Sequence, residues 1–185
     1  MNKKAILNLL ENYQPSFSEE IKFKTEIIDF VEKNDDFALR TNRIGQITGS
    51  AWVVNKNRTK VLLIHHKKLD KWLQIGGHIE ELDQTIAQTV LREVKEESGL
   101  QNITLLSPLV YDIDIHTIPQ KKEIAEHLHF DIRLLAEADE NEPLLPQNNE
   151  VLDIKWCSLE EARQLIKATS YRQSMQRMIE KMVEY

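Results

Sequence analysis

The feature that most restricts the fold of this chain is a glycine pair, Gly76-Gly77, between an apolar run and an amphipathic segment. Residues 72–75 read Trp-Leu-Gln-Ile, a composition that favours a β-strand. From Gln84 to Ser98 the apolar residues recur at helical spacing, and Gly99 supplies a C-terminal stop. Two glycines at the end of a strand let the backbone approach a ligand closely, and their carbonyls could complete a coordination shell that faces the helix. We therefore predict a strand, a loop and a helix in succession.

Short β-branched and apolar runs on both sides of this unit predict a sheet. A turn-rich segment at residues 55–58 separates two of the runs and predicts a hairpin. The expected further strands are 50–54, 60–65, 111–118, 127–135 and 151–157. Two closing helices are expected, one opened by the capping-box pattern of residues 158–161 and one over residues 171–183. Strands that alternate with core helices indicate the α/β class.

The N-terminal part has a different residue pattern, which is typical of helices. Ile6, Leu9 and Leu10 recur at helical spacing, and residues 16–19, Ser-Phe-Ser-Glu, have the form of a capping box for a second helix. From Gly45 onward the helical pattern gives way to short β-branched and apolar runs. We expect an N-terminal helical extension over residues 1–42, packed on the main domain or on a second subunit, and a main domain over residues 43–185.

Composition excludes several functional classes. The chain has 185 residues, of which 41% are hydrophobic and 29% charged, and its formal net charge is -6. A net acidic chain is a poor general binder of polymeric nucleic acid or of an anionic membrane, and no apolar run approaches the length of a membrane span. The single cysteine, Cys157, excludes an internal disulfide and fits a reducing compartment. We expect a cytoplasmic protein.

Three carboxylates share one flank of the helix over residues 84–98. Glu93 and Glu97 are four residues apart, and Glu96 lies beside them. Two unit charges at 4 Å repel by roughly 1 kcal/mol in water, so such a cluster favours a bound cation, and carboxylate oxygens suit magnesium or manganese. Arg92 is four residues before Glu96 and can pair with it. Taken without the glycine pair, the same flank is also typical of a merely solvated helix face.

Residues Gly77 to Leu100 resemble the Nudix box. The segment from Arg92 to Leu100, read Arg-Glu-Val-Lys-Glu-Glu-Ser-Gly-Leu, fits the family pattern at every specified position. Asp83 stands where the family usually has glutamate, and one extra residue separates it from Arg92, which we place in the loop or first turn. The resemblance implies a Nudix-type α/β/α sandwich with a mixed sheet.

The resemblance also implies a divalent-metal-dependent hydrolase that cleaves the pyrophosphate bond of a nucleoside diphosphate linked to another group. Its cofactor would be Mg²⁺, with Mn²⁺ as a substitute, and its partner a small molecule; a homodimer is possible in such a fold. The implied metal ligands are Gly77, Glu93, Glu96 and Glu97, and the implied catalytic residues are Glu93, Arg92 and Glu150. Either Glu93 or Glu150 would be the general base.

Lysines and histidines supply further candidates for substrate contacts. Lys71 precedes the glycine pair and is a candidate for a phosphate contact. His78 and His129 are candidates for hydrogen bonds to phosphate or ribose. His127 and His129 share one strand face, and with His116 they could form a transition-metal site, although polar positions at strand ends are the simpler interpretation.

Two other readings compete with a Nudix hydrolase. A non-catalytic nucleotide-binding module of the same fold usually lacks box glutamates, and all three are present here. An isomerase acting on isopentenyl diphosphate relies on a cysteine early in its core, whereas Cys157 comes late. For a hydrolase the candidate substrates are ADP-ribose or nucleotide sugars, dinucleoside polyphosphates, and damaged nucleoside triphosphates.

Overall fold

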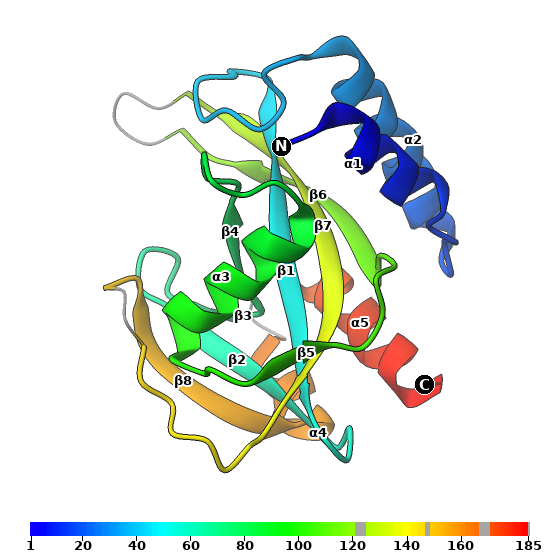
Figure 1. Ribbon diagram of the computed structural model, residues 1–185. Coiled ribbons are helices and arrows are strands. Elements are labelled where there is room, and N and C mark those ends of the chain that lie inside the picture. Colours follow the sequence, from blue (N-terminus) through cyan, green and yellow to red (C-terminus); the bar gives the residue numbers. More distant parts are fainter. Residues whose placement is uncertain (121–124, 147–148, 167–170, 185) are drawn as a thin grey trace. The chain divides into compact units, whose positions relative to one another are not determined.

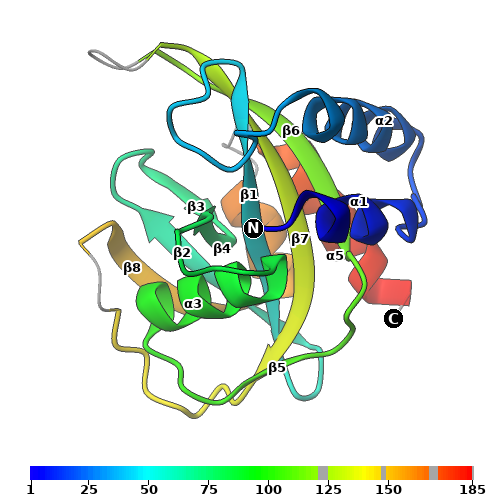
Figure 2. The ribbon, with the colours of Figure 1, turned by 45° about the horizontal axis from the view of Figure 1, so that its top comes forward.

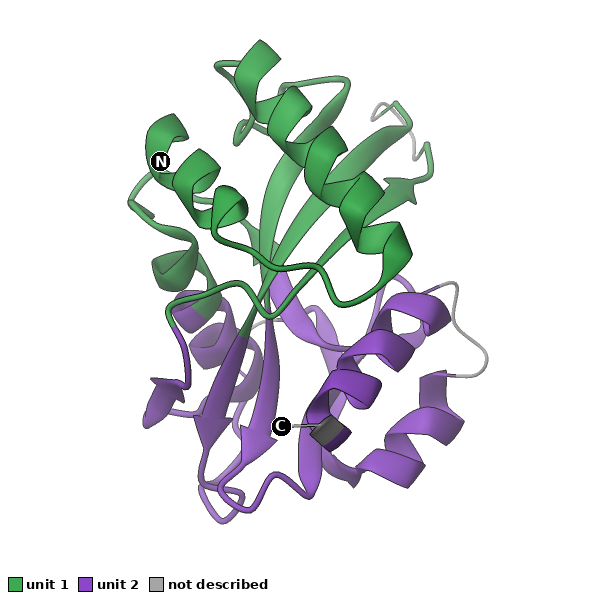
Figure 3. Cartoon of the chain, turned by 90° about the vertical axis from the view of Figure 1, so that its right-hand side faces the viewer, with its two compact units in different colours: residues 1–50, 77–90, 108–134 green, residues 51–76, 91–107, 135–185 purple. Residues whose placement is uncertain are grey.

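The computed structural model describes residues 1–120, 125–146, 149–166 and 171–184, which divide into two compact units (Figure 3). Unit 1 comprises residues 1–50, 77–90 and 108–134, and unit 2 comprises residues 51–76, 91–107 and 135–185. Four elements run from one unit into the other, namely β1 (Gly45–Asn55), β4 (Ile75–His78), α3 (Ile86–Ser98) and β7 (His127–Ala138). Each unit is described by itself below.

Unit 1 contains the N-terminal helices and a long hairpin. Helices α1 (Lys3–Glu11) and α2 (Ser18–Lys33) lie side by side in Figures 1 and 2. The hairpin joins β6 (Asp112–Ile118) to β7 in antiparallel register, with His116 opposite His129. Helix α2 contacts β6, and Phe30 stacks on Phe130 with ring centroids 4.1 Å apart. The helical arm therefore packs on strands of its own chain, one of the two expected arrangements.

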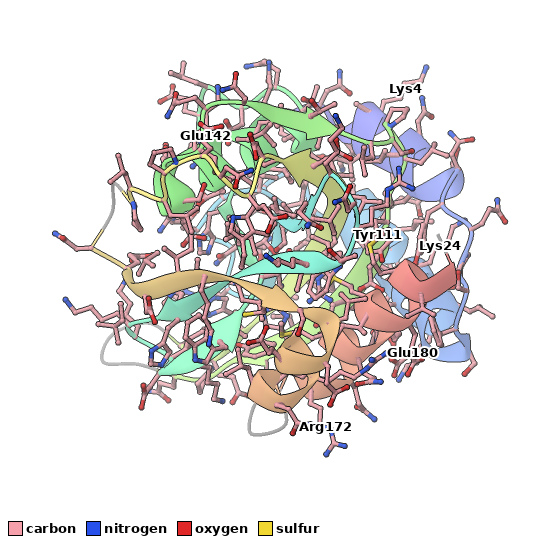
Figure 4. All side chains as sticks on the ribbon, turned by 90° about the horizontal axis from the view of Figure 1, so that it is seen from below. Lys4, Lys24, Tyr111, Glu142, Arg172 and Glu180 are labelled. Carbon is pink, nitrogen blue, oxygen red and sulfur yellow. The ribbon has the colours of Figure 1, made fainter. Side chains whose placement is uncertain are left out.

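Unit 2 contains β2 (Lys60–His66), β3 (Lys71–Leu73), β5 (Ile103–Leu105) and β8 (Val151–Ser158). Strand β2 pairs antiparallel with β1, β3 and β8. Helix α4 (Leu159–Ile166) contacts β2, β3, β8 and α5 (Arg172–Glu184). Figure 4 shows Arg172 and Glu180 on the solvent side of α5, and both residues are exposed. The buried face of α5 includes Met175, Met178 and Ile179.

The described strands form a sheet in the order β3-β2-β1-β7-β5, with β4 paired to β1, β6 to β7 and β8 to β2. A mixed sheet with flanking helices confirms the expected α/β class and the N-terminal helices. No helix among the described residues is long and apolar enough to cross a membrane. The division at residues 42 and 43 stays a prediction.

The structure changes several expected boundaries. The strand expected over residues 72–75 is two strands, β3 and β4, separated at Gln74, and Gly76 and Gly77 lie within β4 rather than after it. Strand β1 begins at Gly45, five residues earlier than expected, and the short strand β5 was not predicted. Helix α3 begins at Ile86, and Gly99 follows it with φ +80°, as its role as a stop requires.

Candidate functional site

The acidic flank of α3 carries the predicted ion pairs within unit 2. The Arg92 guanidinium donates from Nη1 to Glu93 Oε1 at 2.8 Å and to Glu96 Oε2 at 3.3 Å. Its pairing with Glu96 is the i,i+4 contact expected from the sequence. The additional bond to Glu93 means that one guanidinium holds two of the three box carboxylates.

The third carboxylate, Glu97, is the most deeply buried of the three. It is 2% exposed, and its Oε2 accepts a hydrogen bond from the backbone N–H of Gly76 at 3.2 Å. Backbone N–H groups stabilise a carboxylate as an anion, and a buried anion requires such partners. The glycine pair and the acidic helix are thus linked through the amide of Gly76, a contact that the sequence analysis did not predict, while the role of the glycine carbonyls as metal ligands stays a prediction.

Two further predicted residues belong to unit 2: Glu150 lies in the turn before β8, and Lys71 is the first residue of β3. Glu150 forms an ion pair with Lys68, and its carbonyl accepts a hydrogen bond from the N–H of Lys67 at 2.7 Å. The Lys71 ammonium lies over the Tyr171 ring, 5.8 Å from its centroid. Glu150 and Lys71 therefore each have a contact within the chain that a substrate or metal ion would have to exchange or extend.

The loop that carries Asp83 forms a tight turn in unit 1. The Asp83 carboxylate accepts from the N–H of Glu80 at 2.9 Å, and its own N–H donates to the Glu80 carbonyl at 3.0 Å. Asp83 is 5% exposed. Asp83, which departs from the family pattern, therefore lies in a turn before α3. This position agrees with the expectation that the extra residue of the box lies outside the helix.

A row of histidines lies in unit 1. His129 has its ring centroid 4.8 Å from His78, 5.4 Å from His116 and 5.4 Å from His127. Burial, and then the neighbouring His78 and His116, lower the pKa of His129 to about 3. His129 is therefore neutral near pH 7, and in that state one ring nitrogen carries a proton and the other can accept.

A buried charge network behind the histidines was missed by the sequence analysis. Arg133 is fully buried and donates to Asp131 at 2.8 Å, to Asp112 at 2.9 Å and to Asp114 at 3.2 Å. Asp114 is also 3.2 Å from Nδ1 of His116. The signal was present in the sequence, since Asp112-x-Asp114 and Asp131-x-Arg133 place charges at alternate positions of two adjacent strands.

The network keeps the Asp131 carboxylate ionised. Burial has the largest single effect on the pKa of Asp131 and acts to raise it, but the charges of Arg133 and His116 and the hydrogen bonds from Arg133 and Ser50 together bring the pKa below its usual range. Burial likewise acts against the Arg133 charge, yet Asp114, Asp131 and Asp112 raise its pKa. Asp131 also accepts from Thr48 at 2.9 Å and from Ser50 at 2.7 Å. Because every added bond satisfies a buried lone pair, the network holds Asp114, and through it His116, in one orientation.

The chemistry of the box donors suits a hard divalent cation, because carboxylate oxygens are its preferred ligands. As they stand, the described histidine, cysteine and carboxylate side chains include no group of three arranged to hold a metal ion. Glu93 and Glu96 would have to exchange contacts with Arg92 for contacts with the ion. The donor type fits the expected cofactor, and its binding requires side-chain rearrangement.

Cys157 has the properties of a structural residue. It is fully buried on β8, and burial raises the pKa of its thiol to about 11. A thiol with such a pKa is almost entirely protonated near pH 7, and the thiolate is the nucleophile. This argues against the isomerase alternative, which needs a reactive cysteine.

Comparisons with known proteins identify the family to which the box pattern belongs. The model of the NUDIX domain matches residues 46–181. No curated protein matches the chain. Among solved structures, a NUDIX-family hydrolase from Clostridium perfringens is 26% identical, with a TM-score of 0.55 over 77% of this chain and 98% of that one.

Two further structures share the fold at lower identity. An Ap4A hydrolase from C. elegans, in a binary complex, is 17% identical, with a TM-score of 0.57 over 75% of this chain and 95% of its own. The NUDIX domain of NrtR from Shewanella oneidensis, in complex with ADP ribose, is 21% identical, with a TM-score of 0.52 over 84% of this chain and 96% of its own. The expected sheet and helix arrangement therefore has solved counterparts.

Proposed function

Because the chain belongs to the Nudix family and is a pyrophosphohydrolase, we propose that it hydrolyses a nucleoside diphosphate linked to another group, with Mg²⁺ as its cofactor and Mn²⁺ as a substitute. The observation that carries this proposal is the joint placement of Glu93, Glu96 and Glu97 on one flank of α3. Three clustered carboxylates repel one another, and a bound dication relieves that repulsion.

The proposed metal ligands are the three box glutamates, with the Gly77 carbonyl added on sequence grounds alone. When bound, the cation would neutralise charge on the pyrophosphate oxygens and lower the pKa of a coordinated water. Arg92 has a positioning role, because its guanidinium fixes Glu93 and Glu96 before the ion arrives. Glu97 is held by the Gly76 amide and is the ligand that needs least reorganisation.

Proton transfer from the attacking water requires a carboxylate base, and Glu93 and Glu150 both stay proposals. Each carboxylate already has a cationic partner, Arg92 for Glu93 and Lys68 for Glu150. A general base must be in its ionised form to accept that proton. The proposed substrate contacts are Lys71, His78 and His129, of which the neutral His129 would act by hydrogen bonding.

The substrate class is proposed from the box chemistry together with the neighbours that share the fold. One of these neighbours is an Ap4A hydrolase and another is a domain bound to ADP ribose, and both compounds contain a pyrophosphate linkage. The proposed partner is accordingly a small nucleotide derivative, not a polymeric nucleic acid or a membrane. A homodimer and a cytoplasmic location remain predictions.

The experiment that tests the function is a panel of nucleoside diphosphate derivatives. The purified chain is incubated with ADP-ribose, nucleotide sugars, dinucleoside polyphosphates and nucleoside triphosphates, each with Mg²⁺, with Mn²⁺ or with EDTA. We expect release of phosphate-containing products from at least one compound with either cation and none with EDTA. Nucleotide binding without turnover across the whole panel would favour the non-catalytic module and overturn the proposal.

A further inference from the structure

Three histidines of unit 1 share one face of the β6–β7 hairpin. His116 lies directly opposite His129 in the antiparallel register, and His127 lies two residues before His129 on the same side of β7. His78 reaches the same ring from β4. Three imidazoles, one each from β4, β6 and β7, thus gather around His129.

The distances from His129 to its three neighbours match the spacing of imidazole rings around one metal ion. A Zn–N bond is about 2.0–2.1 Å long, which puts the ring centroid about 3.2 Å from the ion, and two tetrahedral ligands then have centroids about 5 Å apart. The distances from His129 to its three neighbours are 4.8, 5.4 and 5.4 Å. As the side chains stand, the described residues include no group of three arranged to hold a metal ion, so the His78 and His129 rings would have to turn about χ2, a torsion with a broad energy profile, while His116 and His127 keep their Nδ1 partners.

Two of the histidines already have the outer partner that metal-binding histidines use. Nδ1 of His116 is 3.2 Å from the Asp114 carboxylate, and Nδ1 of His127 is 2.9 Å from the Ala125 carbonyl. An acceptor at Nδ1 places the proton there and makes Nε2 the metal-binding nitrogen. Arg133 in turn anchors Asp114. The tautomers and one ring orientation are therefore set by the protein.

His129 supplies an independent indication of a ligand. Its Nε2 is buried, and within the described part of the chain it has no hydrogen-bond partner. A buried polar nitrogen in that condition carries a desolvation cost that a metal–nitrogen bond would remove. A cation fits better than an anion, because the Asp114 carboxylate lies 3.2 Å from His116 and the charge of Asp131 acts on His129.

We propose that His116, His127 and His129, with His78 as a fourth donor, form a binding site for a transition-metal dication such as Zn²⁺. Imidazole suits zinc, cobalt, nickel and copper, whereas magnesium prefers oxygen ligands, so this site differs in chemistry from the carboxylates of α3. The proposal does not depend on hydrolysis, since it concerns a second class of ion and donors other than the box carboxylates; His78 and His129, proposed above as substrate contacts, would here serve as metal ligands.

The test is metal binding by the full chain after removal of bound ions with a chelator. Zn²⁺ is titrated by calorimetry, and Co²⁺ by the visible absorption that tetrahedral nitrogen ligands give. We expect one ion per chain with a tetrahedral Co²⁺ spectrum. His129→Gln should weaken Zn²⁺ binding by about 100-fold or more, and His116→Gln should also weaken it. Asp114→Asn should cost about tenfold, through loss of the outer partner.

Matched controls separate this site from the box. His65→Gln changes a histidine that stacks on Trp72 in unit 2, and Glu97→Gln changes a box carboxylate; both should keep wild-type affinity for Zn²⁺. Circular dichroism checks that each variant folds, and if His129→Gln does not, His116→Gln and the wild-type Co²⁺ spectrum decide. The proposal is overturned if the wild type binds no Zn²⁺, if the Co²⁺ spectrum is octahedral, or if His116→Gln binds as tightly as the wild type.

Discussion

At the scale of single residues, each glutamate of the α3 box is held by a hydrogen bond of different origin. The bond from Arg92 to Glu96 follows from helical spacing alone, because residues four apart lie on the same face. The bond to Glu93 depends on the rotamer that Arg92 adopts. The hydrogen bond from Gly76 to Glu97 joins residues 21 positions apart, and only the folded chain brings them together.

The low pKa of His129 predicts how the free energy of unfolding depends on pH. Burial and the neighbouring histidines lower its pKa from 6.5 to about 3, so the folded state excludes a proton that the unfolded state binds below pH 6.5. Its contribution is fully present above pH 6.5 and is lost as the pH falls from 6.5 toward 3, at about 1.4 kcal/mol per pH unit. Urea unfolding of the metal-free protein at pH 7.0, 6.0 and 5.0 measures this dependence.

The comparison for that measurement is His129→Gln. Its free energy of unfolding should fall less steeply with decreasing pH than that of the wild type, by about 1.4 kcal/mol per pH unit. His65→Gln should keep the wild-type dependence, because His65 lies outside the histidine row. Equal pH dependence in wild type and His129→Gln would contradict a depressed pKa for His129.

At the scale of elements, the two capping-box patterns had different outcomes. At α4 the box is formed as predicted, since Ser158 N–H donates to Glu161 at 2.7 Å and Glu161 N–H donates to Ser158 Oγ at 3.2 Å. At α2 the predicted pair of Ser16 and Glu19 was wrong. The helix begins at Ser18, and the buried Glu20 accepts from Ser16 N–H at 2.8 Å and Phe17 N–H at 3.0 Å. Burial of Glu20 decided the register, and pattern alone does not reveal burial.

Gly99 carries a prediction for the end of α3. Its φ of +80° is costly for any residue with a Cβ, and a Cβ there would collide with the backbone of Leu145. Gly99→Ala should therefore destabilise the chain by about 1–3 kcal/mol. Thermal or urea unfolding measures the loss.

Gly49→Ala is the control for that substitution. A Cβ at Gly49 would meet only side-chain atoms of Thr89 and Val90, at 3.2–3.4 Å, and these can shift. We expect a smaller loss than for Gly99→Ala. If Gly99→Ala were as stable as the wild type, the claim that α3 ends at a left-handed residue that must be glycine would be contradicted.

At the scale of the whole molecule, periodicity predicted the α/β class and most elements, because burial of one face dictates the residue pattern of a helix or strand. It could not predict β5, whose three residues are too few to show a period. It also missed Arg133 and its three carboxylates, because charged residues in a strand ordinarily indicate a solvent-facing position. The box motif indicated the chemistry, whereas nothing in the pattern specified the group attached to the diphosphate.

The central claim is that the carboxylates of α3 bind the catalytic cation, and Glu97→Gln tests it most directly. This substitution removes one negative charge and little volume at a ligand that is 2% exposed. Glu32→Gln makes the same chemical change at an exposed position of α2 and serves as the control. The measurement is kcat/KM against Mg²⁺ concentration, with a substrate found in the panel. We predict a loss of about 100-fold or more for Glu97→Gln at limiting Mg²⁺ and wild-type activity for Glu32→Gln; wild-type turnover by a folded Glu97→Gln protein at limiting Mg²⁺ would contradict the claim.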